Sequence, residues 1–234
     1  MIARNLLLCA ALLTLAACSD PTPDTNTTEA PADVTTQARG EGPSVSASEA
    51  LTYSEDGQLF RNDLFGLHIE KPEGWFSQNA EDMLAMQQQS LALMGDDNTR
   101  AMIRSALEST LPLFGFFEVP PGTPGKLNPN ILGSAENIRL APGIASGCDY
   151  LAHARQALRM MQVNYEIDEQ CGQHEVNGTE FDYFEAQAMF GPQLVKQRYL
   201  ALLRDGYAIV IVLSFFDEES EARLKDVLAT LRMQ

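Results

Sequence analysis

The chain has 234 residues and is 45% hydrophobic and 21% charged, a composition typical of a packed globular protein. Its formal net charge is −16, and loss of residues 1–17, where Arg4 is the only charged side chain, would make it one unit more negative. A surface of this sign repels nucleic acid and anionic lipid headgroups, so we expect no nucleic-acid partner.

The first seventeen residues are typical of a secretory signal peptide. Arg4 precedes an apolar run over residues 6–17, which is too short to span a bilayer as a helix. The run ends in Leu15, Ala16, Ala17 and Cys18, which resembles the lipobox of bacterial lipoproteins. That resemblance implies cleavage before Cys18 and lipidation of its side chain. An ordinary signal peptide that happens to contain a cysteine is the alternative.

Residues 18–57 have the composition of a disordered tether. Ser, Thr, Pro, Ala and acidic residues dominate this stretch, and few of its side chains could build a core. We therefore expect a lipidated Cys18 followed by a flexible spacer, with residues 58–234 forming a single folded domain.

Hydrophobic periodicity predicts strands and helices in the first half of this domain. A strand is expected over residues 65–70, because apolar side chains alternate there with polar ones, and residues 71–75 break it. Residues 120–125 are rich in Pro and Gly and must form a loop, and residues 131–140 could hold another strand. Two stretches between these strands have helical spacing: Met83, Met86, Ser90 and Met94, then Ile103, Ala106, Leu107 and Thr110.

The second half carries sharper signals. Ser146 and Asp149 resemble a capping box before an apolar helical face that reaches Met161, and a short strand follows over residues 163–169. The Asn177-Gly178 pair is the strongest short hairpin signal, here between strands at 173–176 and 179–190.

Two more turns lead to the end of the chain. They precede strands at 194–203 and 207–215, and the second of these has no polar side, so it should be central and covered on both faces. Asp217 caps a last helix whose apolar positions are Leu224, Val227, Leu228 and Leu231. The expected fold is α+β, an antiparallel β-sheet meander sandwiched by helices.

This element order resembles the PsbP/DcrB-like superfamily, which includes photosystem II PsbP proteins, Mog-type Ran-binding proteins and DcrB-like bacterial lipoproteins. The resemblance rests on the strand that ends in Pro72, Glu73, Gly74 and Trp75, on the segment at 176–181, and on the closing meander and helix. It implies a binding or assembly module and supplies no shared catalytic motif.

No motif for catalysis occurs in the sequence. A nucleophile elbow, a phosphate-binding Gly-Lys-Ser/Thr loop and a His-Glu-x-x-His zinc motif are all absent. His68, His153 and His174 lack a carboxylate or nucleophile at motif spacing, so we expect no catalytic residue and no cofactor.

Cys148 and Cys171 allow two kinds of chemistry. Outside the cytoplasm paired thiols tend to oxidise, which favours a disulfide between the predicted helix and the segment after the next strand. The alternative is a zinc site in which His153 and His174 complete the ligand set, and unpaired thiols are the third possibility.

Three classes of function follow. The favoured one is a non-enzymatic, lipid-anchored periplasmic protein that binds or helps to assemble another component of the cell envelope. Ser19 after the lipobox favours the outer membrane, because Asp at that position retains many Gram-negative lipoproteins at the inner membrane. The alternatives are a carrier of a small ligand or metal, and an enzyme whose site is not recognisable from sequence.

The lipobox makes a testable prediction. The intact mass of the native protein should correspond to a chain that begins at Cys18 and carries acyl groups. Cys18→Ala should prevent lipidation and the associated processing, since the thiol is the attachment atom. A native mature terminus at any other residue would contradict the lipobox interpretation.

Overall fold

The computed structural model describes residues 52–54, 57–78, 82, 110–124, 126–139, 141, 143–161 and 163–234. The predicted signal peptide with Cys18, most of the predicted tether, and the helical stretches over residues 83–94 and 103–107 lie outside the described residues. In the described part of the chain, no helix is long and apolar enough to cross a membrane.

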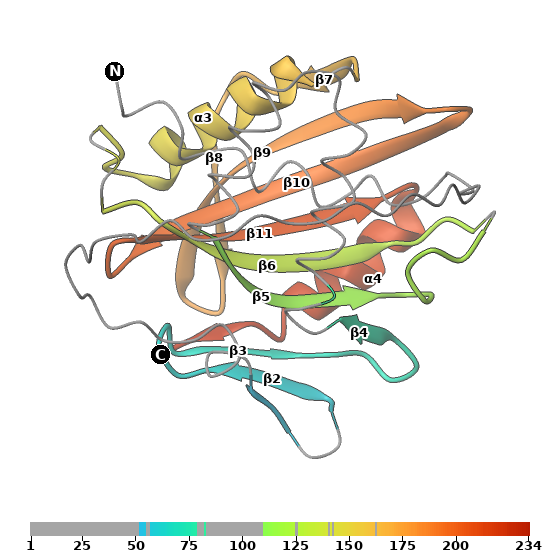
Figure 1. The fold of residues 1–234 in the computed structure, drawn as a ribbon, viewed down its shortest axis with the longest axis horizontal. Coiled ribbons are helices and arrows are strands. Elements are labelled where there is room, and N and C mark those ends of the chain that lie inside the picture. The colour runs from blue at the N-terminus through green and yellow to red at the C-terminus, as the bar shows by residue number, and fades with distance from the viewer. Residues whose placement is uncertain are drawn as a thin grey trace, which may run out of the picture.

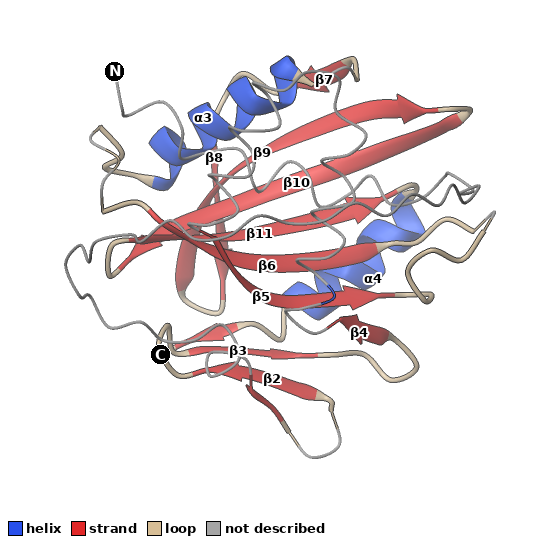
Figure 2. Ribbon diagram, in the orientation of Figure 1, coloured by secondary structure: helices blue, strands red, loops and turns tan. Residues whose placement is uncertain are grey.

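Antiparallel strands make up most of the described structure, with two helices beside them (Figures 1 and 2). The larger sheet has the strand order β4-β5-β6-β11-β10-β9-β7, and β8 also pairs with β9. Its strands are β4 (Phe76–Gln78), β5 (Thr110–Phe117), β6 (Asn130–Asn137), β7 (Tyr165–Ile167), β8 (Gly172–Val176), β9 (Thr179–Phe190), β10 (Gln193–Arg204) and β11 (Tyr207–Phe215).

A smaller sheet has the order β1-β2-β3-β12. Its strands are β1 (Thr52–Tyr53), β2 (Leu59–Asn62), β3 (Leu67–Glu70) and β12 (Arg232–Met233). The described helices are α3 (Gly147–Met160) and α4 (Glu218–Leu228). This is the α+β class with an antiparallel sheet that the sequence predicts.

The β8–β9 and β10–β11 hairpins form where local turn chemistry predicts them. Asn177 and Gly178 have φ values of 49° and 82°, and Asp205 and Gly206 have 53° and 81°. Both central residues of each turn are therefore left-handed, as a two-residue hairpin that follows the strand twist requires. Together the turns at residues 191–192 and 205–206 produce the predicted meander of β9, β10 and β11.

Strand β11 lies in the middle of the larger sheet, between β6 and β10, and is buried along almost its whole length. Ile209 and Ile211 point into one core, which α4 covers, and Val210 and Val212 point into the other, which α3 covers. The two helices therefore pack on opposite faces of the sheet, and the prediction of a doubly covered strand is confirmed.

Helix α3 begins where the sequence predicts. The Ser146 side chain accepts a hydrogen bond from the Asp149 backbone N–H and donates one to the Asp149 carboxylate, which satisfies the first turn. Apolar side chains of α3 then pack on β9 and β10, where the rings of Phe184 and Tyr199 stack with centroids 4.8 Å apart. This contact provides the cover on the first face.

The second face is covered jointly by α4 and the smaller sheet. Asp217 and Ser220 form a reciprocal capping box at the start of α4. The apolar side of α4 packs with residues of β2 and β3, including Phe60 and Leu67, against the larger sheet. The chain then returns as β12 to pair with β3, which holds the smaller sheet to the end of the helix.

Strands β1 and β5 differ from the sequence predictions. Strand β1 pairs with β2 although it lies inside the range assigned to the tether, so the structured part begins by Thr52. Thr110 was expected at the end of a helical stretch but begins β5, a strand that was not predicted. Pro112 lies within β5 next to a register shift between Pro112 and Phe114, which explains why the strand pattern is hard to recognise.

The α4 core yields a prediction for stability. Leu228 is 2% exposed, so Leu228→Ala should lower the free energy of unfolding by about 2–5 kcal/mol through lost burial and a residual cavity. Urea denaturation of both proteins would measure this. Leu64→Ala is the matched control, because Leu64 is 45% exposed and its truncation should change stability by less than about 0.5 kcal/mol. Equal losses in the two variants would contradict this assignment of the core.

Candidate functional site

The two cysteines form a disulfide that joins the first turn of α3 to the residue before β8. The Cα atoms of Cys148 and Cys171 are 5.9 Å apart, within the range that a disulfide spans. Of the three alternatives for these thiols, the structure thus contains the favoured one.

In the structure, His153 and His174 do not join the cysteines as the alternative prediction of a zinc site requires. His153 is exposed on α3, and His174 packs edge-on against Tyr183 on the α4 side of the sheet. Burial and the nearby charges of Arg198 and Lys225 lower the pKa of His174. Among the described residues, the potential ligand atoms that cluster with the two sulfurs belong to Asp182, and neither imidazole joins them.

Asp182 is not among the site residues predicted from the sequence, although the register of the predicted hairpin points to it. It lies 34 residues after Cys148, and its carboxylate Oδ2 accepts a 2.9 Å hydrogen bond from the Cys148 backbone N–H. The register of the Asn177-Gly178 hairpin places Asp182 opposite Gln173, two residues after Cys171. Because Gln173–Asp182 is the fourth pair of the predicted hairpin counted from the turn, the register of the hairpin places Asp182 near Cys171.

A buried carboxyl group lies on the α3 side of the sheet. Glu136 of β6 is 1% exposed, and its Oε2 accepts a 2.7 Å hydrogen bond from the Tyr150 hydroxyl. Its Oε1 has no hydrogen-bond partner among the described residues. Desolvation raises the pKa of Glu136 to about 8, and the Tyr150 hydrogen bond opposes part of this rise.

An enzyme site built on scattered residues is one of the alternatives that the sequence leaves open. Such a site would gain support from a pocket that gathered Asp149, His153 or His174, and the pocket described next is lined by none of them. Asp149 is instead engaged at the start of α3, where hydrogen bonds from Ser146 and Ala145 lower its pKa.

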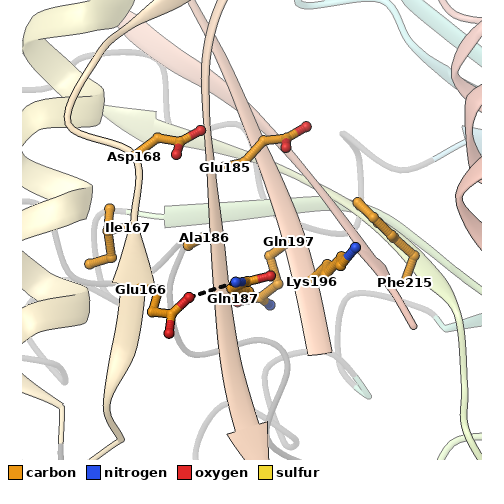
Figure 3. Close-up of a pocket in the computed structure, with 9 residues that line it drawn as sticks. All are labelled: Glu166, Ile167, Asp168, Glu185, Ala186, Gln187, Lys196, Gln197 and Phe215. Atoms are coloured by element: carbon orange, nitrogen blue, oxygen red, sulfur yellow. Dashed lines mark hydrogen bonds between the residues drawn. The ribbon is translucent and has the colours of Figure 1, made fainter. Parts of the chain in front are cut away.

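A surface pocket of about 280 Å³ lies where β7, β9 and β10 run side by side (Figure 3). Three carboxylates line it, those of Glu166, Asp168 and Glu185, and Lys196 contributes an amine. Figure 3 shows Gln187 beside Glu166, and its amide donates a 2.6 Å hydrogen bond to that carboxylate. The rest of the lining is Ile167, Ala186, Gln197 and Phe215.

The face that carries this pocket continues beyond the end of β11. The last residue pair between β10 and β11 is Lys196 with Phe215, whereas β9 and β10 stay paired as far as Phe190 and Gln193. Met189 lies opposite Leu194 in this extension and is 55% exposed. The open end of the sheet therefore combines carboxylates with an apolar pair in which Met189 is exposed and Leu194 is half-buried. We call this set (Glu166, Asp168, Gln187, Met189 and Leu194) the hairpin surface.

Arg198 separates the hairpin surface from α4. It is 13% exposed on its side chain, forms an ion pair with Glu185, and contacts Glu221 of α4 at 3.1 Å. Lys225 forms a further ion pair with Glu221, and its hydrogen bond is the main cause of a lowered Glu221 pKa. Glu185 is thus already paired, which leaves Glu166 and Asp168 as the carboxylates most open to a ligand.

No family model and no curated protein matches this chain. Solved structures that it resembles include cyanobacterial PsbP (CyanoP) from Synechocystis sp. PCC 6803, at 12% identity and a TM-score of 0.45 over 83% of this chain and 98% of that one. Another is LpqN of Mycobacterium tuberculosis, described as involved in cell envelope biogenesis, at 12% identity and a TM-score of 0.40 over 81% of this chain and 99% of that one.

Glu136 predicts a pH dependence of stability. Its pKa is raised from 4.5 to about 8 in the folded state, so folding favours the protonated form. The contribution is complete below about pH 4.5 and is lost as the pH rises through about 8, which should lower the free energy of unfolding by a few kcal/mol.

Urea denaturation at pH 5 and pH 8 would measure this loss, and Glu136→Gln should flatten it because the amide does not ionise. Glu175→Gln, at an exposed position of β8, is the control and should keep the slope of the unchanged chain. A Glu136→Gln protein with an undiminished slope would assign the pH dependence to other groups.

Proposed function

We propose that this chain is a non-enzymatic lipoprotein of the bacterial cell envelope whose α+β domain holds a partner protein at the hairpin surface. The lipobox at Cys18 supports the anchor, and the disulfide is typical of an extracytoplasmic protein. Two acyl signals on one residue hold a protein stably at a membrane, so the domain would act beside the bilayer. Ser19 favours the outer membrane, facing the periplasm.

The observation that carries the binding role is the unequal cover of the sheet. Helix α4 packs on β11, but β9 and β10 extend beyond the end of β11. In this extension Met189 is exposed beside carboxylates. Protein contacts combine an apolar centre with a polar rim, and Met189 with its neighbouring carboxylates supplies both kinds of group. Methionine suits such a surface because its flexible side chain adapts to a partner.

The charges of the hairpin surface indicate the chemistry of the partner. Glu166 and Asp168 are exposed carboxylates, and the nearby Lys196 is the pocket's one amine. A partner segment with an Arg or Lys next to an apolar side chain would complement both parts, since the base could reach the carboxylates while the apolar group covers Met189. We therefore expect a basic, amphipathic segment of another envelope protein.

Cross-linking in intact cells would test this proposal. Met189→Asp and Glu166→Lys should each reduce recovery of the cross-linked partner by about tenfold or more, because each removes one half of the contact. Both positions are exposed, so each variant should fold with a stability within about 0.5 kcal/mol of the unchanged chain.

The matched control is Glu175→Lys, which makes the same charge change at an exposed residue on the α3 side of the sheet. Its partner recovery should equal that of the unchanged chain. Equal recovery with all three variants, or a loss that follows only the net charge, would reject the hairpin surface as the binding site.

A further inference from the structure

The disulfide has a third neighbour that is itself able to bind a metal ion. The ligand atoms of Cys148, Cys171 and Asp182 all lie within 4.8 Å of one another, and all three residues are half-buried. They come from three elements: the first turn of α3, the residue before β8, and β9. Packing, rather than local sequence, brings them to one point.

The position of the carboxylate is fixed independently of the sulfurs. Asp182 accepts its hydrogen bond from the Cys148 backbone N–H, and that bond does not involve either thiol. The approach of α3 to β9 also depends on Gly147, where a Cβ atom would lie 2.8 Å from Asp182 Oδ2 and 2.6 Å from the Ala201 carbonyl oxygen. A carboxylate can accept more than one partner, so this bond leaves capacity for a cation.

We propose that reduction of the Cys148–Cys171 disulfide creates a Zn²⁺ site whose protein ligands are the two thiolates and the Asp182 carboxylate. Two sulfur ligands and one oxygen ligand suit Zn²⁺ in tetrahedral coordination, and the fourth position would be taken by water or by a ligand from a partner. The first turn of α3 adds a favourable field for the Cys148 thiolate, because helix N-termini stabilise negative charge.

Reduction of the disulfide requires an external dithiol. The dithiol gives two electrons and two protons to the S–S bond, which breaks into two thiols, and is itself oxidised to a disulfide. Binding of Zn²⁺ then releases the two thiol protons as the two S–Zn bonds form. The oxidised chain lacks thiolates and cannot make these bonds, so disulfide and metal are alternative states of the same three residues.

Zinc titration of the full chain would test the site. Cys9→Ala and Cys18→Ala are included in every protein, so that Cys148 and Cys171 supply the only thiols. After reduction by a dithiol and its removal without oxygen, the chain should bind one Zn²⁺ in competition with a chromophoric chelator. The oxidised chain should bind none at this site, and neither should a Cys148→Ala and Cys171→Ala double variant.

Two matched substitutions separate this ligand set from others. Asp182→Asn keeps an oxygen that can accept the Cys148 N–H but removes the charge, and it should weaken Zn²⁺ binding roughly tenfold or more. His153→Ala should leave the affinity unchanged, because the imidazole does not join the cluster. Circular dichroism of each reduced, metal-free variant would show whether it keeps its fold.

Three outcomes would overturn the proposal. These are absence of Zn²⁺ binding by the reduced, folded chain, unchanged affinity in folded Asp182→Asn, and loss of affinity in His153→Ala. If Asp182→Asn fails to fold, the reduced parent chain is titrated with Co²⁺ in place of Zn²⁺. A thiolate-to-Co²⁺ charge-transfer band with the visible spectrum of tetrahedral coordination would support the site, and its absence would reject it.

Discussion

Burial of β11 on both faces is the constraint on which the rest of the structure depends. A strand whose consecutive residues are apolar, such as Ile209 and Val210, exposes apolar side chains on both faces and must lie between two covers. It also needs a strand partner on each edge. One is β10, joined to it by a two-residue turn, and the other is β6, which lies some 70 residues earlier and pairs with it over eight positions. This non-local pairing joins the two halves of the domain.

The two covers are fastened in different ways. Helix α4 follows β11 directly, so its position follows from a short connection, the Asp217 cap and the return of β12 to β3. Helix α3 precedes the meander that it covers, and contacts of its side chains hold it in place. The disulfide fixes its first turn, and Arg155 donates hydrogen bonds to the carbonyl oxygens of Asp168 and Glu169 from its middle.

The sequence predicts features whose cause is local. The Asn177-Gly178 and Asp205-Gly206 turns, the Ser146 and Asp217 caps and the apolar run of β11 were all identified, because each depends on residues within a few positions of one another. Pro112 concealed β5, since proline is unfavourable inside a sheet.

What could not be predicted depends on tertiary packing. The pairing of β6 with β11 and the approach of Cys148 on α3 to Asp182 require knowledge of which surfaces meet. The two histidines resembled ligands by residue type alone, but the faces of α3 and β8 turn them away from the sulfurs. The hairpin surface has no local signature, because its exposure results from the end of β11 at Phe215.

The fastening of α3 connects the cysteine cluster to the proposed binding face. The segment that leads from β7 to Cys171 carries both Asp168, which lines the pocket, and the two carbonyl oxygens that Arg155 holds. Glu169 is held again by its ion pair with Arg159. This segment therefore runs from the pocket wall at Asp168 to the disulfide at Cys171. Arg155 and Arg159 bind this segment independently of the sulfurs, and β7 is also paired with β9. A change at the cysteines should therefore shift the first turn of α3 more than it shifts Glu166.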